Sequence, residues 1–519
     1  MRRHLLLLFM LLVSGHCFAQ LKQYNITSYG AVPNSTTVCT KALQSAIDDC
    51  NAHGGGDVVV PTGVFIIGTT HLKSNVNLYL QKGAVLRGSP NLDDYTPYTP
   101  DTPYQHIHLG MFLTQDAENV SITGDGQLDG NGDAYFELDK AKKLDTSVTK
   151  YSRQGANFRH VESGIGDGPI VPKDRPYQMF IFSNCKRVTI KDVFITKSPF
   201  WCMHMADCES VLISNIRLWT NMLAPNADGI DLTSCTNVIV TGCDIRTGDD
   251  SFAITGFDHH FEVPGFEHLH HQSENILISN CNLQSSSCAL RIGFLDQNDV
   301  RNVQVTNCNI TNSSRGIGIF LRDKGSLENL SFTNITIDTK LRTGDWWGNA
   351  EPIHISAVRG KPGVKLGEIR HVTFNNIICK GENGMLLWGT DESILHDIYF
   401  NHIRFELTDS KLNDVAGGNI DMRGTLYVKE GLFKSDIPGL LAQNVDGLII
   451  NDFQLKWTDP RMPWLTNGVE INHFKNVRIT NFEGTGAPNN PKAYPVEVKY
   501  GEHFTTDVKA VSVHQVDVK

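Results

Sequence analysis

The sequence predicts an all-β fold, a parallel β-helix, with a short helix that caps its N-terminal end. Three observations carry this prediction. A short phrase of alternating apolar residues recurs through most of the 519-residue chain at about the length of one solenoid coil. One stretch with helical periodicity precedes these copies. No Pro/Gly/Ser-rich linker divides the chain, so residues 20–519 are expected to form a single domain.

The repeated phrase reads apolar-x-apolar-x-Asn, with Asp or Gly replacing Asn in two copies. Its copies are Val188–Asp192, Val211–Asn215, Val238–Gly242, Ile276–Asn280, Val303–Asn307 and Leu330–Asn334. Their last positions lie 23, 27, 38, 27 and 27 residues apart, and weaker copies follow at 372–376, 398–401, 448–451 and 477–481. Such strands enclose an apolar interior only when they stack in parallel from coil to coil. The Asn at each bend is expected to form a ladder, with its amide bonded to backbone groups of its own and neighbouring coils.

The open end of such a stack needs a cap, and residues 40–52 are expected to supply it as a helix. The apolar residues of this stretch fall on one helical face: Ala42, Leu43, Ala46, Ile47 and Cys50. Gly54-Gly55-Gly56 then ends the helix. Three segments without the repeat are assigned to loops that form a cleft: 131–176, 257–272 and 338–352.

The first residues predict export. Met1-Arg2-Arg3-His4 precedes an entirely apolar run over 5–13, and Cys17-Phe18-Ala19 offers small residues for cleavage. Residues 1–19 are therefore interpreted as a signal peptide, and the protein is expected to be secreted or periplasmic. No later stretch approaches the roughly 20 apolar residues that a membrane span needs.

Charge and cysteine content limit the partners. The net charge of −10 disfavours nucleic acid, whose partners usually carry a basic surplus. An acidic polysaccharide held in a local basic cleft stays compatible with it. Removal of residues 1–19 leaves 11 of the 12 cysteines, an odd number that cannot all pair within one chain. Some cysteines are therefore expected to be buried and free. Separately, the protein is expected to be a monomer.

Two acidic motifs lie close to one coil apart. Asp228 belongs to Asn226-Ala227-Asp228-Gly229-Ile230-Asp231, and Asp249-Asp250 follows 21 residues later. Residues one coil apart stack about 4.8 Å from each other, so the three carboxylates should converge. Crowded carboxylates raise the pKa of one member, and glycoside hydrolysis needs one acid that protonates the leaving oxygen and one carboxylate that activates water. Either motif alone would more simply be a turn, but their coil register favours catalysis.

Several further phrases occur in an order that resembles glycoside hydrolase family 28, which contains polygalacturonases and rhamnogalacturonan hydrolases. They are Ile26–Ala31, Gly54–Pro61, Leu128–Gly132, Arg175-Pro176 and Ser198–Trp201. The resemblance covers roughly residues 24–340 and implies an inverting hydrolase on a right-handed, single-stranded, pectin lyase-like β-helix. It implies that Asp249 is the proton donor, that Asp228 and Asp250 activate water, and that Asn226 helps to position that pair. No metal and no other cofactor is expected.

The chain departs from the family at two positions one and two coils further on. Cys288 stands where the family has the His of a Gly-His-Gly phrase, and Gly318 and Phe320 replace the Arg and Lys of an Arg-Ile-Lys phrase. Alternation places Phe320 outward, where its ring is expected to stack on a sugar. Arg291, also outward, is expected either to bind a substrate carboxylate in a bidentate manner or to form an ordinary ion pair between coils.

Several other side chains keep two interpretations each. His204 lies one coil before Asp228 and either reaches the sugar or is a buried structural histidine. A group in the 338–352 segment and just beyond it forms either a sugar platform or loop packing: Trp346, Trp347, Glu351 and His354. The 257–272 segment is either a lid that faces the substrate or a solvated loop. Its five histidines match no usual zinc spacing: His259, His260, His268, His270 and His271.

The sequence thus favours a hydrolase of a galacturonate-containing or other pectic glycan. Two alternatives stay open. A pectic polysaccharide lyase shares the fold but needs a basic proton abstractor, whereas this chain offers acids. A non-catalytic glycan-binding β-helix derived from a hydrolase would explain the missing His, Arg and Lys, although the aspartates are intact.

Overall fold

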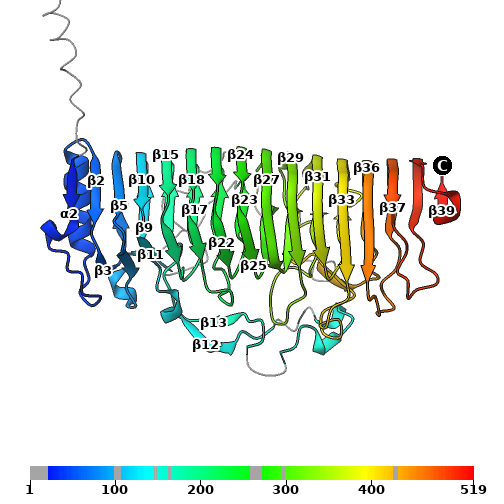
Figure 1. The fold of residues 1–519 in the computed structure, drawn as a ribbon, viewed down its shortest axis with the longest axis horizontal. Coiled ribbons are helices and arrows are strands. Elements are labelled where there is room, and N and C mark those ends of the chain that lie inside the picture. The colour runs from blue at the N-terminus through cyan, green and yellow to red at the C-terminus, as the bar shows by residue number, and fades with distance from the viewer. Residues whose placement is uncertain are drawn as a thin grey trace, which may run out of the picture.

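A computed structural model describes residues 22–98, 107–144, 147, 149–161, 165–256, 272–294, 298–424 and 431–519. Within these residues, 33 strands pair into one parallel sheet that winds along the molecule. Figure 1 shows the coils as a row, from the helix α2 (Thr40–Ala52) at one end to β39 (Val513–Val518) at the other. The parallel β-helix is thereby confirmed, and parallel crossovers of this kind are almost always right-handed. No described helix has the length and apolar character needed to cross a membrane.

The sheet wraps into three faces, named here the first, second and third face. The first face is built from β4 (Thr70–His71), β9 (Phe112–Gln115), β14 (Phe180–Ser183), β17 (Met203–Ala206), β20 (Ile230–Thr233), β23 (Phe252–Thr255), β26 (Cys288–Phe294), β28 (Arg315–Leu321), β30 (Ile353–Ala357) and β32 (Met385–Trp388). The second comprises β1 (Gln23–Asn25), β2 (Gly56–Val60), β5 (Val76–Leu80), β10 (Glu118–Gly124), β15 (Lys186–Lys191), β18 (Glu209–Ser214), β21 (Thr236–Thr241) and β24 (Ser273–Ser279). The third comprises β3 (Gly63–Ile67), β6 (Ala84–Gly88), β11 (Gln127–Asp129), β16 (Phe194–Thr196), β19 (Arg217–Trp219), β22 (Asp244–Thr247) and β25 (Asn282–Ser285).

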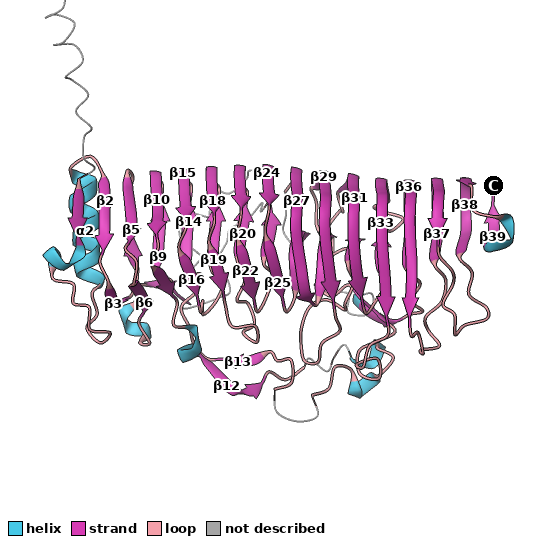
Figure 2. Ribbon diagram, in the orientation of Figure 1, coloured by secondary structure: helices cyan, strands magenta, loops and turns pink. Residues whose placement is uncertain are grey.

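Longer strands complete the C-terminal half, because the bend between the second and third faces becomes continuous strand there. They are β27 (Val300–Ser313), β29 (Ser326–Thr339), β31 (Glu368–Gly381), β33 (Leu395–Thr408), β36 (Leu440–Thr458), β37 (Val469–Glu483) and β38 (Val496–Thr506). β36 also joins the first face by pairing with β32. Short elements outside the coils are coloured apart in Figure 2: the 3-10 helices η1 (Ile26–Tyr29), η2 (Leu92–Asp94), η3 (Gly132–Tyr135), η4 (Thr149–Tyr151), η5 (Gly155–Asn157) and η6 (Ala510–Ser512).

The repeated phrases form the second face in the register that their spacing predicts. Val188 pairs with Val211, and Val211 pairs with Val238. The bend asparagines do form a ladder, but their partners differ from the expected backbone groups. The Asn334 amide donates to the Asn307 side chain at 3.1 Å, and the Asn376 amide donates to Asn334 at 2.7 Å. These asparagines have left-handed backbones, with φ near +55°, which Asn tolerates better than most residues.

The inward side chains make one apolar core that extends from Tyr24 to Val498. Phenylalanines stack along it, as in the pairs Phe332–Phe374 and Phe374–Phe400, whose ring centroids are each 4.9 Å apart. The 11 cysteines of the described residues are all buried and free. The sequence predicted buried, free cysteines, but only for some of them. The cap is also confirmed: α2 covers the first coil with its apolar face, the five residues predicted for it.

Loops collect on one side of the stack, where β12 (Phe136–Ala141) and β13 (Ile170–Pro172) pair antiparallel below the coils in Figure 1. The segment 131–176 is therefore more structured than a plain loop. Two further antiparallel pairs are β7 (Pro97–Tyr98) with β8 (Ile107–His108) and β34 (Asn419–Asp421) with β35 (Leu432–Lys434). Residues 1–19 and all of 257–272 except Gln272, with the five histidines of that segment, lie outside the described residues.

Candidate active site

The three aspartates stand just before two neighbouring strands of the first face. Ile230 of β20 pairs with Phe252 of β23, so the residues preceding them, Asp228 and Asp250, lie side by side on adjacent coils. The Gly229 N–H donates to the Asp250 carbonyl oxygen at 2.8 Å, which fixes this register at the site. The coil spacing of the two motifs is thus realised as adjacent coils.

The carboxylates converge as the sequence predicts. One oxygen from each of Asp228, Asp249 and Asp250 lies within 4.8 Å of the others. Their exposed fractions are 4%, 7% and 6%, so little water screens their mutual repulsion. Oxygens at that spacing are also the ligands that a hard cation takes, although a guanidinium already supplies positive charge beside them.

Asp249 is tied to the motif of the preceding coil. Its Oδ2 accepts a hydrogen bond from the Asn226 N–H at 3.0 Å. Burial, followed by the charge of Asp250, raises the pKa of Asp249 to about 7. A carboxyl group with that pKa keeps its proton up to near-neutral pH, which is the property of a general acid.

Asn226 acts here through its backbone, and its side chain serves a different neighbour. Its backbone is left-handed, with φ of +56°, and its Oδ1 accepts from Arg175 Nη2 at 3.2 Å. Arg175 also donates to the Pro199 and Pro225 carbonyl oxygens at 2.8 and 3.0 Å and stacks on Phe200. Arg175 therefore ties the loop before Asp228 to the preceding coil.

Asp250 is held by two donors. Its Oδ2 accepts from Arg291 Nε, and its Oδ1 accepts from the Cys288 N–H at 3.2 Å. Arg291 also donates from Nη1 to the Gly293 carbonyl oxygen at 3.0 Å and lies over the Phe294 ring at 5.1 Å. Of the two interpretations of Arg291, the structure supports the ion pair between coils, placed inside the site.

Asp228 has the weakest support of the three. Burial raises its pKa well above the ordinary value, and the charges of Asp249, Asp231 and Asp250 add to the effect, while Arg291 opposes it. Its Oδ1 has no hydrogen-bond partner within the described part of the chain. Asp231 is thus a fourth carboxyl of the cluster. The sequence offered a signal for it, because it ends the same motif as Asp228.

His204 fits the structural interpretation. Its side chain is fully buried, its Nε2 lies 2.9 Å from Thr233 Oγ1, and its ring meets Trp201 edge-on at 5.2 Å. Burial lowers the pKa of His204 to about 3, so the ring is neutral at any ordinary pH. In this structure His204 supports the floor of the site and presents no surface to a sugar.

Phe320 points outward as alternation predicts, but its ring is 4% exposed. The guanidiniums of Arg315 and Arg322 flank the ring, with their Cζ atoms 5.0 and 5.1 Å from its centroid. The ring covers Gly318, where an added Cβ would lie 2.4 Å from the Phe320 Cζ. The expected sugar stacking therefore meets a physical obstacle: coil neighbours already cover the ring.

A network of charged residues, which the sequence did not predict, lies on the coils that follow the three aspartates. Arg315 lies one coil after Cys288 and pairs with it in the parallel sheet. The Nη2 of Arg315 lies 3.1 Å from Glu351 Oε1. Glu351 also accepts from His354 Nδ1 at 3.1 Å. Because Glu351 comes from an insertion, no repeat spacing could place it opposite Arg315.

In the 338–352 segment, one tryptophan fits loop packing and the other could still form a platform for a sugar. Trp346 is 1% exposed, and its Nε1 donates to the Asp167 carbonyl oxygen at 2.9 Å, which is loop packing. Trp347 is 41% exposed beneath the Arg423 guanidinium, at 5.3 Å from the ring. Only Trp347 of this pair keeps a surface for a ligand.

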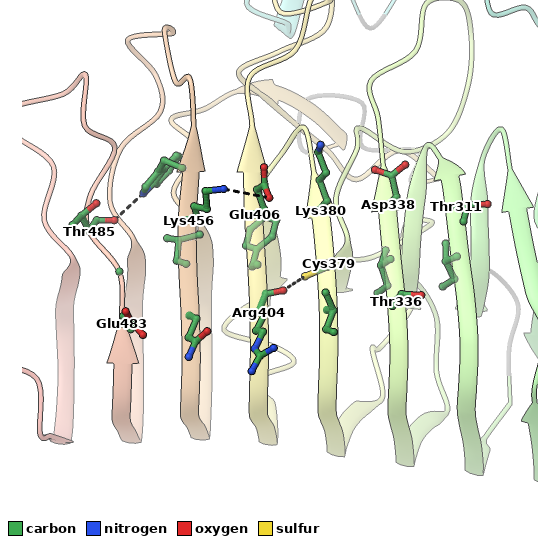
Figure 3. A pocket seen from close by; sticks show the side chains of 18 of the residues that line it. Thr311, Thr336, Asp338, Cys379, Lys380, Arg404, Glu406, Lys456, Glu483 and Thr485 are labelled. Carbon is green, nitrogen blue, oxygen red and sulfur yellow. Dashed lines mark hydrogen bonds and ion pairs between the residues drawn. The ribbon is translucent and has the colours of Figure 1, made fainter.

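A separate groove of about 910 Å³ lies away from the carboxylates, along the outward side of the long strands after the asparagine bend. Figure 3 shows its charged side chains in rows from coil to coil, with both signs interleaved. They are Asp338, Lys380, Arg404, Glu406, Lys456 and Glu483. The groove belongs to the third face, whereas the aspartates belong to the first.

Three comparisons with known proteins bear on the chain. The model of glycosyl hydrolases family 28 matches residues 50–344. A "Probable polygalacturonase" of Vitis vinifera is 26% identical over 246 residues, 45% of this chain and 44% of that protein. An "Exo-poly-alpha-D-galacturonosidase" of Dickeya chrysanthemi is 30% identical over 252 residues, 44% of this chain and 41% of that protein. The chain thus spans less than half the length of these two curated relatives.

A solved structure supports the fold. The family 28 exopolygalacturonase of Yersinia enterocolitica superposes with a TM-score of 0.58 at 17% sequence identity. The superposition covers 96% of this chain and 79% of that one. At that identity the likeness establishes a shared architecture and leaves the chemistry to the residues of the site.

Proposed function

The chain belongs to glycosyl hydrolases family 28, and we propose that it hydrolyses a glycosidic bond in a galacturonate-containing or other pectic glycan. The observation that carries the proposal is the convergence of Asp228, Asp249 and Asp250 from two adjacent coils. The names of the two relatives, a polygalacturonase and a poly-galacturonosidase, support the substrate class.

The roles follow from the surroundings of each carboxyl. Asp249 is the proton donor to the leaving oxygen, because its raised pKa keeps it protonated near pH 7. Asp250 forms an ion pair with Arg291, and with Asp228 it accepts hydrogen bonds from the attacking water. Asn226 positions Asp249 through its N–H. No metal or cofactor is part of this proposal.

Inversion is the stereochemical outcome we propose. The spacing of the carboxyl groups bears directly on it. Inverting glycosidases usually hold their carboxyl groups about 6.5–9.5 Å apart and retaining ones about 5–5.5 Å apart. One oxygen from each carboxyl here lies within 4.8 Å of the others, which is nearer to the retaining range. Against a covalent nucleophile stands Asp250, because both of its oxygens already accept hydrogen bonds.

The sugar beside the scissile bond need not carry a carboxylate. Gly318 and Phe320 occupy the positions at which the family has Arg and Lys, and neither can bind an anion. Arg291, a basic residue of the site, is already paired with Asp250. We therefore propose that the glycan contains a neutral or substituted sugar at this position, with galacturonate elsewhere in the chain.

Export and assembly remain proposals drawn from the sequence. Residues 1–19 are a signal peptide, the mature chain is secreted or periplasmic, and it works as a monomer. N-terminal sequencing of protein recovered from the medium or periplasm tests the first two. Light scattering of the purified chain tests the third.

The function is tested by incubating the full chain with galacturonate, rhamnogalacturonan and neutral pectic oligosaccharides. We expect new reducing ends without new ultraviolet absorbance, and loss of turnover in Asp249→Asn. Asp125→Asn, an exposed aspartate in a turn, is the matched control. An absorbing, unsaturated product would establish a lyase instead. Binding without any product from the wild type would establish the glycan-binding module that the missing His, Arg and Lys suggest.

A further inference from the structure

Asp231 is a buried acid to which no role has yet been given. It is the second residue of β20 and points outward, and its exposed fraction is 2%. Neither of its carboxyl oxygens has a hydrogen-bond partner among the residues that the structure describes. A buried ionised carboxylate without partners is strongly disfavoured, so such a group normally takes up a proton.

The neighbours of Asp231 are known from strand register. His204 pairs with it on the preceding coil and Ala253 on the following one. His204 is neutral and directs its Nε2 to Thr233. Neither neighbour therefore supplies a positive charge to Asp231.

Arg291, the cation whose charge acts on Asp231, is directed elsewhere. Arg291 pairs with Ala253 one coil further on, and its guanidinium donates to Asp250 and to the Gly293 carbonyl oxygen. The small side chain of Ala253 separates Asp231 from Arg291 in this column. The other charged groups of the cluster are the carboxyls of Asp228, Asp249 and Asp250, which repel a further negative charge.

The electrostatics agree with this geometry. Burial raises the pKa of Asp231 well above its ordinary value, Arg291 opposes the shift, and Asp250 and Asp249 add to it. A proton on Asp231 removes one of the like charges that raise the pKa of Asp228. Asp228 then ionises more readily and can serve as a base.

We propose that Asp231 is a positioning residue that holds its proton throughout the working pH range and so leaves the negative charge of the cluster on Asp228 and Asp250. The role assigned to that charge rests on the proposed function. The protonation of Asp231 does not, because it follows from burial and from the lack of partners.

The sign of the effect on stability is definite. Above pH 3.8, the ordinary pKa of Asp, the unfolded chain loses this proton while the folded chain retains it. The wild type therefore loses stability as pH rises, until the folded pKa is reached. Asparagine mimics the neutral acid in shape and does not titrate, so Asp231→Asn escapes this loss.

The experiment is urea unfolding of wild type, Asp231→Asn, Asp231→Leu and the control Asp125→Asn at intervals from pH 4 to pH 8. We expect the folding equilibrium constant of each Asp231 variant, relative to wild type, to rise by up to tenfold per pH unit. Asp125→Asn should show no such slope. A pH-independent offset between the Asn and Leu variants reports packing alone and leaves the slope unchanged.

A flat or falling ratio would overturn the proposal, because it would mean that Asp231 is ionised in the folded chain. Failure of both variants to fold at pH 4 would also overturn it, since a neutral side chain is what the proposal places there. The test needs no substrate. If the chain proves not to be a hydrolase but the ratio rises, the proposed function fails and the protonated Asp231 stands.

The pH profile of kcat/KM adds a second readout when activity is present. Replacement of a neutral acid by a neutral amide leaves the charge on Asp228 and Asp250 as it was. The acid limb of the Asp231→Asn profile should therefore keep its midpoint, whatever happens to kcat. A shift of that midpoint by one pH unit or more would contradict the proposal.

Discussion

Asp250 differs from Asp249 and Asp228 because a guanidinium donates to one of its two oxygens. Arg291 donates to one and the Cys288 N–H to the other. Asp249, by contrast, lies in surroundings that favour the protonated form. Carboxyl groups with different environments can take the acid and base roles of one reaction, as the proposed mechanism requires.

Replacement of Arg291 by Gln tests the importance of that pair. Loss of one partner from a buried ion pair destabilises by about 3–5 kcal/mol, and the low end is expected because Arg291 is 13% exposed. Without the guanidinium, the site loses the positive charge that lowers the pKa of Asp228, so the acid limb of kcat/KM should move to higher pH. Urea unfolding and pH profiles measure both effects. Arg478→Gln, at an exposed position, is the control, and equal stability of the two variants would contradict the account.

The general acid predicts the alkaline limb. Asp249 loses its proton as pH rises through about 7, so kcat/KM should fall above that pH. Asp249→Asn should lower kcat by about 10²- to 10⁴-fold, the usual contribution of a positioned acid. Activity that stays constant from pH 6 to pH 9 would show that Asp249 is not the donor.

Residue-level prediction from the sequence succeeded where spacing alone determined position. Asp228 and Asp249 were placed together because one coil separates them. The environment of Phe320 was not predictable. Alternation indicates that the ring points outward, but it does not indicate that the side chains of Arg315 and Arg322 cover it. The partner of Arg291 was left between two interpretations, because a side chain that long can reach several coil neighbours.

At the scale of elements, the asparagine ladder links strand to strand at the bend of the second face. Asn307 accepts from the Asn334 amide at 3.1 Å and adopts a φ of +55°. The sequence predicted the ladder from the repeated Asn. It misassigned the partners, because the left-handed bend turns each amide toward the side chain of the adjacent coil.

Two substitutions at Asn307 separate the bond from the backbone conformation. Asn307→Gly loses the side-chain hydrogen bond but tolerates the positive φ, at a cost of about 1 kcal/mol. Asn307→Ala also carries the left-handed strain and should be less stable by about a further 1 kcal/mol. Urea unfolding measures the difference. An alanine variant as stable as the glycine variant would show that the bend imposes no strain.

Across the whole molecule, one core from Tyr24 to Val498 holds the coils in register and so holds the carboxylates together. The repeat predicted this architecture, and helical periodicity predicted the bounds of α2. The loops were less predictable, because insertions such as 131–176 follow no period, and the pairing of β12 with β13 inside that segment has no repeat to announce it. Site geometry thus depends on the solenoid, while access to the site depends on its insertions.

The most direct test of the central claim is proton NMR of the product released by the wild type from a pectic oligosaccharide with α-linked galacturonate. Hydrolysis by water held between Asp228 and Asp250 predicts that the new reducing end appears first as the β-anomer and then mutarotates. Asp249→Asn should release product at least about 10²-fold more slowly under the same conditions. An α-anomer as the first product would contradict inversion at this site, and equal product from Asp249→Asn would contradict the site itself.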